Sequence, residues 1–325
     1  MATSIGIPLA LESWSYFPLF KVFFEHLGCN VIISRPTNKQ TIEKGGNLVV
    51  DETCLPCKVA AGAAASLDGK VDFILLHRFV SLRPYFTNCP KYIAFPDVMR
   101  LNLKTPILSP WVDYRRNKKG LEEALAETAI TITGDKKAIK EAFRAAGKVQ
   151  NHFVKLLYKH KTTPEAFDII FSDAADDRRH SGHNQVCIGV VGHPYIMHDP
   201  YTSLQFIKKL RDMGVYIITN EMIPERIVRR YDKTVRKIPF WEHERKLMGA
   251  AFFLIQTGKV DGLINVSSFS CGTNSVTGEF ITHRAAEHKM PLLHLAFDEH
   301  TAEAGIATRL EAFINLIKWK RGELL

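Results

Sequence analysis

The sequence predicts an α/β fold made of two related domains, each built on a parallel sheet. Short apolar segments such as 4–9 and 30–34 alternate with amphipathic helical segments, which is typical of a parallel sheet. The run at 71–76, apolar except for Asp72, is typical of a strand that helices cover on both faces. The same order of segments returns in the second half of the chain. These three observations together predict a doubled α/β architecture with connecting helices.

The first half contains alternating strands and helices. Strands are expected at 4–9, 30–34 and 71–76, with a short one at 92–95 that Pro96 would end. Helices are expected at about 16–27, 37–44 and 56–67. The pattern from 120 to 158 is helical and includes a long helix for which Asp135 is the expected N-cap.

The second half repeats this order of elements. The matching segments are 5–7 and 188–190, 31–34 and 216–219, 69–72 and 258–261, and 92–97 and 293–298. In both halves the first helix is expected to end at a glycine, Gly28 and Gly214. Because several consecutive elements match in order, duplication explains them better than chance similarity between strands.

Three parts of the chain follow from this pattern. We expect an N-terminal α/β domain at 1–115, a helical connection and linker at 116–184, and a C-terminal α/β domain at 185–325. The stretch 172–184 is polar, rich in small residues and free of apolar periodicity, so the domain boundary is placed there.

Composition limits the classes of protein to which the chain can belong. The chain has 325 residues, of which 46% are hydrophobic, but no run of about 18 uninterrupted apolar residues. Residues 1–7 lack the features of a signal peptide, so we expect a cytoplasmic protein without a membrane span. Six cysteines are too few for a disulfide scaffold, which favours metal binding, catalysis or core packing as their use.

The chain is basic, with a formal net charge of +9. Such a charge suits a polyanionic partner, which could be nucleic acid, a phosphate-bearing coenzyme or an acidic protein. The lysines and arginines occur in short clusters, and no nucleic-acid-binding signature accompanies them. We therefore expect a solvated basic surface and no nucleic-acid partner.

Four cysteines are the main candidates for metal ligands. Cys54 and Cys57 lie at the start of the expected helix 56–67, where the positive end of the helix dipole favours a thiolate. Cys89 follows the strand 71–76 through a loop, and Cys271 lies between a strand at 263–266 and a helix at 275–288. Loops after the carboxyl ends of parallel strands form binding sites, so these cysteines are expected at the ligand-binding edge. An iron-sulfur cluster and a zinc site both remain open on this evidence, as do buried or incidental thiols.

Two further groups of residues are expected at the same edge. His193, Tyr195 and Asp199 follow the first strand of the second domain, where they could shape a substrate cleft or form a turn capped by Asp199. Glu299 and His300 follow the strand 293–297 and are the acid/base candidates, because histidine titrates near neutral pH and a carboxylate can orient it. For this pair a structural role is the simpler interpretation.

Several of these segments together resemble the acyl-CoA dehydratase activase-related proteins, kin of the iron-sulfur subunits of 2-hydroxyacyl-CoA dehydratase and benzoyl-CoA reductase. The segments that carry the resemblance are 5–10, 36–39, 51–59, 89–91 with 96–97, 270–272 and 298–313. The resemblance implies two flavodoxin-like domains and an oxygen-sensitive 4Fe-4S or related cluster whose ligands match Cys54, Cys89 and Cys271. Cys57 departs from the family pattern. Three cysteine ligands would leave one iron open to a substrate oxygen, whereas Cys57 as a fourth ligand would favour pure electron transfer.

The resemblance also implies a function. The chain would accept or relay low-potential electrons from an ATP-hydrolysing activase and could act on an acyl-CoA, in which case it would be a dehydratase or reductase. The alternatives are a noncatalytic partner or assembly protein with a structural metal site, and a zinc protein that binds nucleic acid. The sequence contains no P-loop and no G-x-G-x-x-G, so the ATP-binding part of such a system is not expected here. Whether the chain is itself an enzyme, and whether it forms homo- or hetero-oligomers, stays open.

Overall fold

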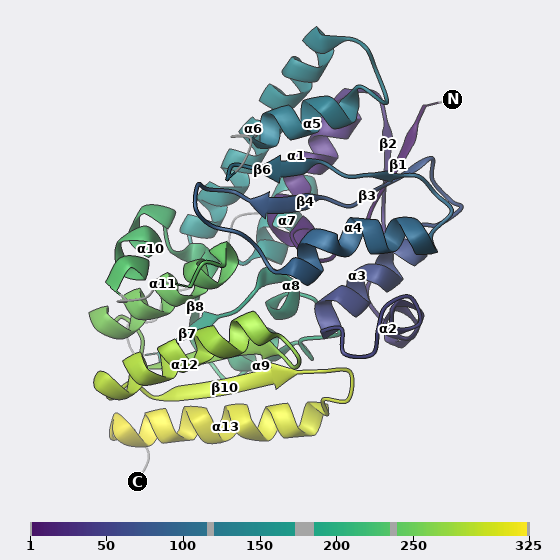
Figure 1. The fold of residues 1–325 in the computed structure, drawn as a ribbon. Helices are drawn as coiled ribbons and strands as arrows, with labels where there is room; N and C mark the ends of the chain where they lie inside the picture. Colours follow the sequence, from purple (N-terminus) through teal and green to yellow (C-terminus); the bar gives the residue numbers. More distant parts are fainter. Residues whose placement is uncertain (1, 116–119, 173–184, 235–238, 324–325) are drawn as a thin grey trace. The chain divides into compact units, whose positions relative to one another are not determined.

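The structure is a computed structural model that describes residues 2–115, 120–172, 185–234 and 239–323. It divides into two compact units, of which unit 1 comprises Met1–Lys155 with Phe240–Glu242 and unit 2 comprises Leu156–Pro239 with His243–Leu325. In the described ranges the strands of every sheet pair in parallel, and helices alternate with them along the chain (Figure 1). The predicted flavodoxin-like α/β class with parallel sheets is confirmed.

Unit 1 contains a four-stranded sheet in the order β2-β1-β3-β5. Its strands are β1 (Ser4–Ile7), β2 (Asn30–Ile33), β3 (Phe73–Leu75) and β5 (Ile107–Leu108). Its helices are α1 (Ser13–His26), α2 (Lys39–Gly46), α3 (Leu55–Ala65), α4 (Pro90–Asn102), α5 (Leu121–Ala129) and most of α6 (Lys136–Tyr158). Most of these elements lie within a few residues of the expected segments.

Two short strands, β4 (Arg78–Ser81) and β6 (Trp111–Asp113), extend the pair β3–β5. The regular pairing breaks off between β3 and β4 and between β5 and β6. Ile74 pairs with Ile107 before this break and Arg78 pairs with Trp111 after it, so the register is the same on both sides. Backbone hydrogen bonds span the break, because the N–H of Arg78 donates to the carbonyl of Pro110 at 2.8 Å. The extension brings the chain to the loop that precedes Cys89.

The strand expected at 92–95 is wrong, because these residues belong to α4. Cys89 is the N-cap of this helix and Pro90 its first residue, a position where proline fits because its missing N–H is not needed. Tyr92, Phe95 and Met99 are buried at helical spacing. The expected match between 92–97 and 293–298 therefore fails, since the second segment forms the strand β10 (Leu292–Phe297).

Unit 2 contains a sheet in the order β10-β9-β7-β8, with β7 (Cys187–Val191), β8 (Tyr216–Thr219) and β9 (Gly262–Ser268) beside β10. When the strands of each four-stranded sheet are numbered along the chain, both sheets have the order second, first, third, fourth. The helices are α7 (Thr163–Phe171), α8 (Pro194–Met197), α9 (Phe206–Asp212), α10 (Glu225–Tyr231), α11 (Glu242–Thr257), α12 (Gly272–Glu287) and α13 (Glu303–Lys320), with two 3-10 turns, Asn220–Met222 and Asp232–Thr234.

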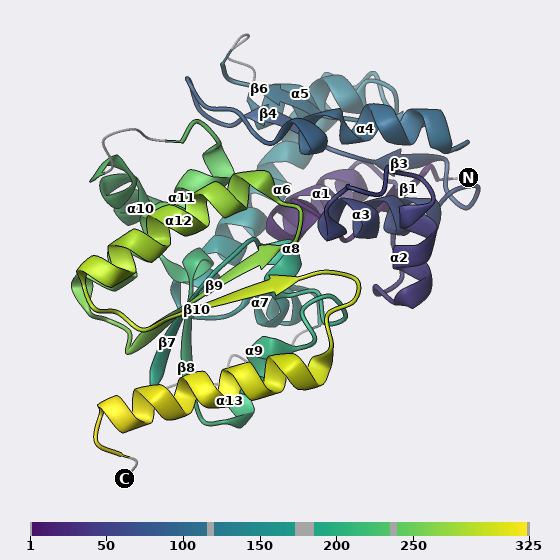
Figure 2. The ribbon, with the colours of Figure 1, turned by 60° about the horizontal axis from the view of Figure 1, so that its bottom comes forward.

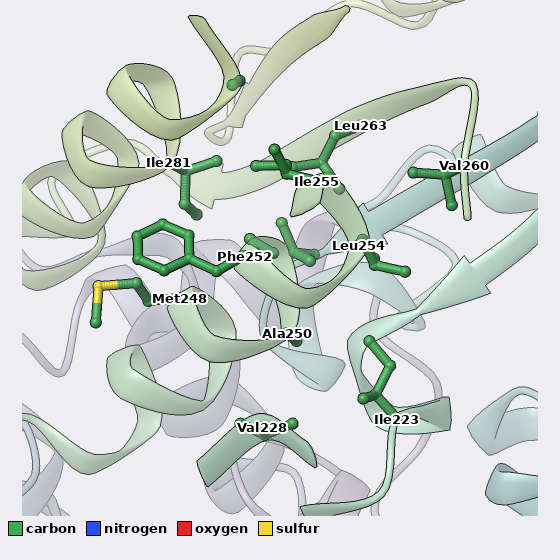
Figure 3. Packing of buried hydrophobic residues seen from close by; sticks show 13 residues of the cluster. Ile223, Val228, Met248, Ala250, Phe252, Leu254, Ile255, Val260, Leu263 and Ile281 are labelled. Carbon is green, nitrogen blue, oxygen red and sulfur yellow. The ribbon is translucent and has the colours of Figure 1, made fainter. Parts of the chain in front are cut away.

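Helices cover both faces of the unit 2 sheet. Helices α11 and α12 lie on one face, and α9 and α13 lie on the other (Figure 2). Phe252 and Met248 of α11 pack beside Ile281 of α12 in a cluster of buried apolar side chains that also includes Leu263 of β9 (Figure 3). The cluster thus packs β9 against α12, and Cys271 lies between these two elements.

The expected connection at 116–184 is described only in part. Residues 116–119 and 173–184 lie outside the described residues, so the expected linker at 172–184 does too, apart from Ser172. The chain passes from unit 1 to unit 2 within α6, between Lys155 and Leu156. The boundary expected at 184 stays a prediction.

Among the described residues no helix is long and apolar enough to cross a membrane.

The start of α7 contains a partly buried ion pair with a pH-dependent contribution to stability. Both carboxylate oxygens of Glu165 accept hydrogen bonds from Arg211, at 2.9 and 3.1 Å, and one also accepts from the backbone and hydroxyl of Thr162. Burial alone would raise the pKa of Glu165, but the Arg211 and Thr162 hydrogen bonds and the Arg211 charge lower it from 4.5 to about 2.

Because the pKa of Glu165 is lowered in the folded chain, its stabilisation is complete above pH 4.5 and is lost as the pH falls toward 2. Arg211 is 27% exposed, so solvent screens the pair and we expect a loss of about 2 kcal/mol in unfolding free energy. Glu165→Gln should flatten the fall in unfolding free energy between pH 5.5 and pH 3, measured by urea denaturation. The exposed control Asp212→Asn should leave this fall unchanged. An equal fall in Glu165→Gln and in the parent chain would contradict the assignment.

Candidate functional site

The three cysteines that the resemblance marks as ligands share one structural position. Cys54, Cys89 and Cys271 are the N-cap residues of α3, α4 and α12, which contain 11, 13 and 16 residues. At an N-cap the side chain lies beside the first backbone N–H groups and the positive end of the helix dipole. A side chain that carries negative charge is favoured at such a position.

Unit 1 brings three thiols together. Cys54 and Cys57 are hydrogen bonded, and Cys89 and Lys91 are close enough to affect the titration of Cys57. The hydrogen bond with Cys54, burial, and the charges of Cys54 and Cys89 raise the pKa of Cys57 well above its usual range, although Lys91 opposes them. Cys57 is 4% exposed, whereas Cys54 and Cys89 are partly exposed.

A close contact between two helices fixes α3, which carries Cys54 and Cys57. A Cβ atom on Gly62 of α3 would lie 1.8 Å from the carbonyl oxygen of Thr41, and one on Gly45 would lie 1.8 Å from the carbonyl oxygen of Lys58. The backbones of α2 and α3 therefore touch, and only glycine fits at these two positions. The contact sets the position of the N-terminus of α3.

The loop that leads to Cys89 is held by a distant segment of the same unit. Thr87 forms a parallel bridge with Trp241, and the N–H of Thr87 donates to the carbonyl of Phe240 at 3.0 Å. The carboxylate of Glu242 accepts from the backbone N–H of Leu82 at 2.9 Å and from Nε of Arg83 at 2.7 Å. Both ends of the loop 82–88 are thus tied to residues 240–242.

Cys271 lies in a polar network within unit 2. Its Sγ is 3.5 Å from Oγ1 of Thr273, which donates to Oε1 of Glu244 at 2.9 Å. The other carboxylate oxygen of Glu244 accepts from Nδ2 of Asn274 at 3.2 Å, and Nε2 of His193 lies 3.1 Å from Oε1. Ser270 adopts a left-handed conformation with φ of 65°, which turns the chain from β9 into α12.

Glu244 is the centre of this network. Burial alone would raise the pKa of Glu244, but the charge of His193 and the hydrogen bonds from His193, Thr273 and Asn274 lower it. The carboxylate therefore stays ionised despite being almost fully buried.

The residues expected to shape a substrate cleft divide between two roles. The ring of His193 stacks on Tyr195 with a centroid distance of 4.9 Å, and its Nε2 belongs to the Glu244 network. Asp199 is buried, and its carboxylate accepts from the backbone N–H groups of Tyr201 and Thr202. Asp199 therefore caps a turn.

The acid/base candidates Glu299 and His300 lie in an exposed turn after β10. The side chain of Asp298 organises this turn, because it accepts from the N–H of His300 at 2.9 Å and from the hydroxyl of Thr301 at 2.8 Å. Their predicted role stays a prediction.

The structure thus groups Cys54, Cys57 and Cys89 in unit 1 and joins Cys271 to Thr273 and Glu244 in unit 2. Within the described residues, no group of three or more His, Cys, Asp or Glu side chains has an arrangement ready to hold a metal ion. All six cysteines are described, and none forms a disulfide.

The sequence analysis did not single out Glu242 and Glu244. Their signal was the run Glu242-His243-Glu244 at the start of a helix whose later residues are mostly apolar.

The sequence matches a known protein family over most of its length. Residues 4–223, more than half of the 325 residues, match the family described as "CoA enzyme activase uncharacterised domain (DUF2229)". No curated protein matches the sequence. The match covers Cys54 and Cys89 with the whole of the first sheet and the first strands of the second. The chain belongs to the CoA enzyme activase uncharacterised domain family.

Proposed function

We propose that this chain is an iron-sulfur protein of CoA enzyme activase systems that accepts low-potential electrons and passes them on. The observation that supports the proposal is that the three candidate ligands, Cys54, Cys89 and Cys271, are all N-cap residues. Thiolates are the ligands that iron-sulfur clusters take from proteins. The chemistry of this donor set therefore fits such a cluster.

Cys54 and Cys89 of unit 1 and Cys271 of unit 2 would hold the cluster, with Cys57 either a fourth ligand or a thiol outside it. A bound iron-sulfur cluster supplies one-electron transfer at a potential that its surroundings set. Lys91 near the unit 1 thiols and the positive ends of α3 and α4 would offset the negative charge of the thiolates.

The proposed function also gives roles to the predicted acid/base and substrate-cleft residues. Glu299 and His300 would exchange protons with a bound substrate, for which an acyl-CoA is the candidate, and His193 and Tyr195 would contact it. The electron donor would be an ATP-hydrolysing activase that docks on the basic surface of the chain, which has a net charge of +9.

Anaerobic purification with iron and sulfide analysis tests the proposal, together with EPR after dithionite reduction. We expect about four irons and about four sulfides per chain, retained in Cys57→Ala if three cysteines bind the cluster. Loss of iron in Cys57→Ala would make Cys57 the fourth ligand and the chain a closed electron carrier. An activase with ATP should reproduce the dithionite spectrum, and an unchanged spectrum would contradict that partner.

Absence of iron from the parent chain would overturn the cluster. A full complement of zinc would then support the alternative of a structural metal site, because four-cysteine zinc sites are structural. Turnover of an acyl-CoA by the reduced protein would separate an enzyme from a relay.

A further inference from the structure

Two buried carboxylates flank the point at which the chain returns from unit 1 to unit 2. Glu242 is the last residue of the segment that belongs to unit 1, and Glu244 is the second residue after the return. Their side chains are 1% and 3% exposed. Burying a carboxylate is costly unless charges and hydrogen bonds compensate for the lost water, so each of the two has a defined set of partners.

Glu242 holds the segment that leads to Cys89. Its carboxylate bonds to Leu82 and Arg83 at the start of the loop 82–88, and its own N–H donates to the carbonyl of Thr87 at 2.8 Å near the end of that loop. Cys89 is two residues beyond Thr87. One residue therefore fixes both ends of the loop that delivers this cysteine to the start of α4.

Glu244 holds the turn that carries Cys271. It accepts from the side chains of Thr273 and Asn274, the second and third residues after Cys271. A hydroxyl has one hydrogen to donate. Because Thr273 donates it to Glu244, the contact with Cys271 at 3.5 Å presents the oxygen lone pairs of Thr273 to the thiol hydrogen. Glu244 thereby holds the Thr273 hydroxyl that the Cys271 thiol contacts.

The two carboxylates stand two residues apart at the start of α11. Residues with this spacing do not share a helix face. Each can therefore bond within its own unit without competing with the other for donors.

We propose that Glu242 and Glu244 are positioning residues for the two cysteine segments, Glu242 for Cys89 and Glu244 for Cys271. The purpose of this positioning, to present thiolates to one cluster, rests on the proposed function. The selective coupling of each carboxylate to one cysteine does not, and it can be measured without any metal.

The test compares alkylation of individual cysteines by iodoacetamide, followed by peptide mass spectrometry, in the full chain after treatment with an iron chelator. Glu242→Gln should raise the alkylation rate of Cys89 by about fivefold with that of Cys271 unchanged. Glu244→Gln should raise the rate of Cys271 by about fivefold with that of Cys89 unchanged. The matched controls Glu25→Gln in unit 1 and Glu287→Gln in unit 2 remove carboxylates that are 41% and 65% exposed and should change neither rate.

Buried Cys29 reports general unfolding, because a merely destabilised chain would expose it along with the others. If Glu→Gln variants are too unstable to purify, Arg83→Met and Thr273→Val remove the partners and should give the same selective increases. Equal acceleration of all cysteines, or no acceleration, would overturn the positioning roles. Selective acceleration in a chain that binds no iron would sustain the positioning roles and refute only the proposed cluster.

Discussion

If the proposed cluster is present, a chain carrying Cys89→Ser should lose its iron while keeping its fold. A serine hydroxyl stays protonated at neutral pH and is a poor ligand for iron in a cluster, so we expect iron to fall from about four to below about one per chain. Serine is also a favoured N-cap residue, whereas Cys89 makes no side-chain capping hydrogen bond. A serine cap on α4 should add about 0.5–1 kcal/mol to the unfolding free energy. The expected result is thus lost iron with unchanged or slightly higher thermal stability. Cys54→Ser and Cys271→Ser should behave alike, because both residues are N-caps.

Cys29→Ser is the matched control for these variants. Cys29 is buried at 7% exposure, and burial raises the pKa of its thiol. A hydroxyl there would cost about 1 kcal/mol of unfolding free energy, and the iron content should not change. Iron analysis and thermal melts should therefore separate the four variants. The three ligand variants should lose iron and keep their thermal stability, whereas Cys29→Ser should keep iron and lose stability. Full iron in Cys89→Ser, or loss of iron in Cys29→Ser, would contradict the assignment of the ligands.

The sequence predicted most strands because each has apolar side chains on both faces and a glycine or polar break at its end. That rule failed at 92–95, where the break at Pro96 suggested the end of a strand. The helical spacing of Tyr92, Phe95 and Met99 and the N-terminal Pro90 were stronger signals, and they place these residues in α4.

The positions of the cysteines could be predicted because each follows a strand and precedes a helix. The groups that hold them could not, because Glu242 contacts a loop about 160 positions away along the chain. Gln150 is a similar case. Its amide accepts from the N–H of Leu19 at 3.2 Å and donates to the carbonyl of Ser15 at 2.8 Å, replacing a hydrogen bond of α1 beside Pro18. Contacts of this kind leave no local pattern in the sequence.

Gly62→Ala should strongly destabilise unit 1. The new Cβ would lie 1.8 Å from the carbonyl oxygen and 2.7 Å from the carbonyl carbon of Thr41, both backbone atoms of α2 that cannot rotate away. The two helices would have to separate, so we expect a loss of about 3 kcal/mol or more in unfolding free energy, measured by urea denaturation. Because Cys54 and Cys57 stand at the start of α3, the iron content of the proposed cluster should fall in the same variant.

Gly147→Ala is the matched control, because Gly147 lies inside α6 and a Cβ there would meet no atom within 4 Å. Alanine has the higher helix propensity, so this variant should gain about 0.5–1 kcal/mol in unfolding free energy and keep its iron. The same substitution should therefore change stability in opposite directions at two helical sites of one unit. If Gly62→Ala were as stable as the parent chain, the close contact between α2 and α3 would not exist, and the fixed position of the Cys54 thiol would lose its structural basis.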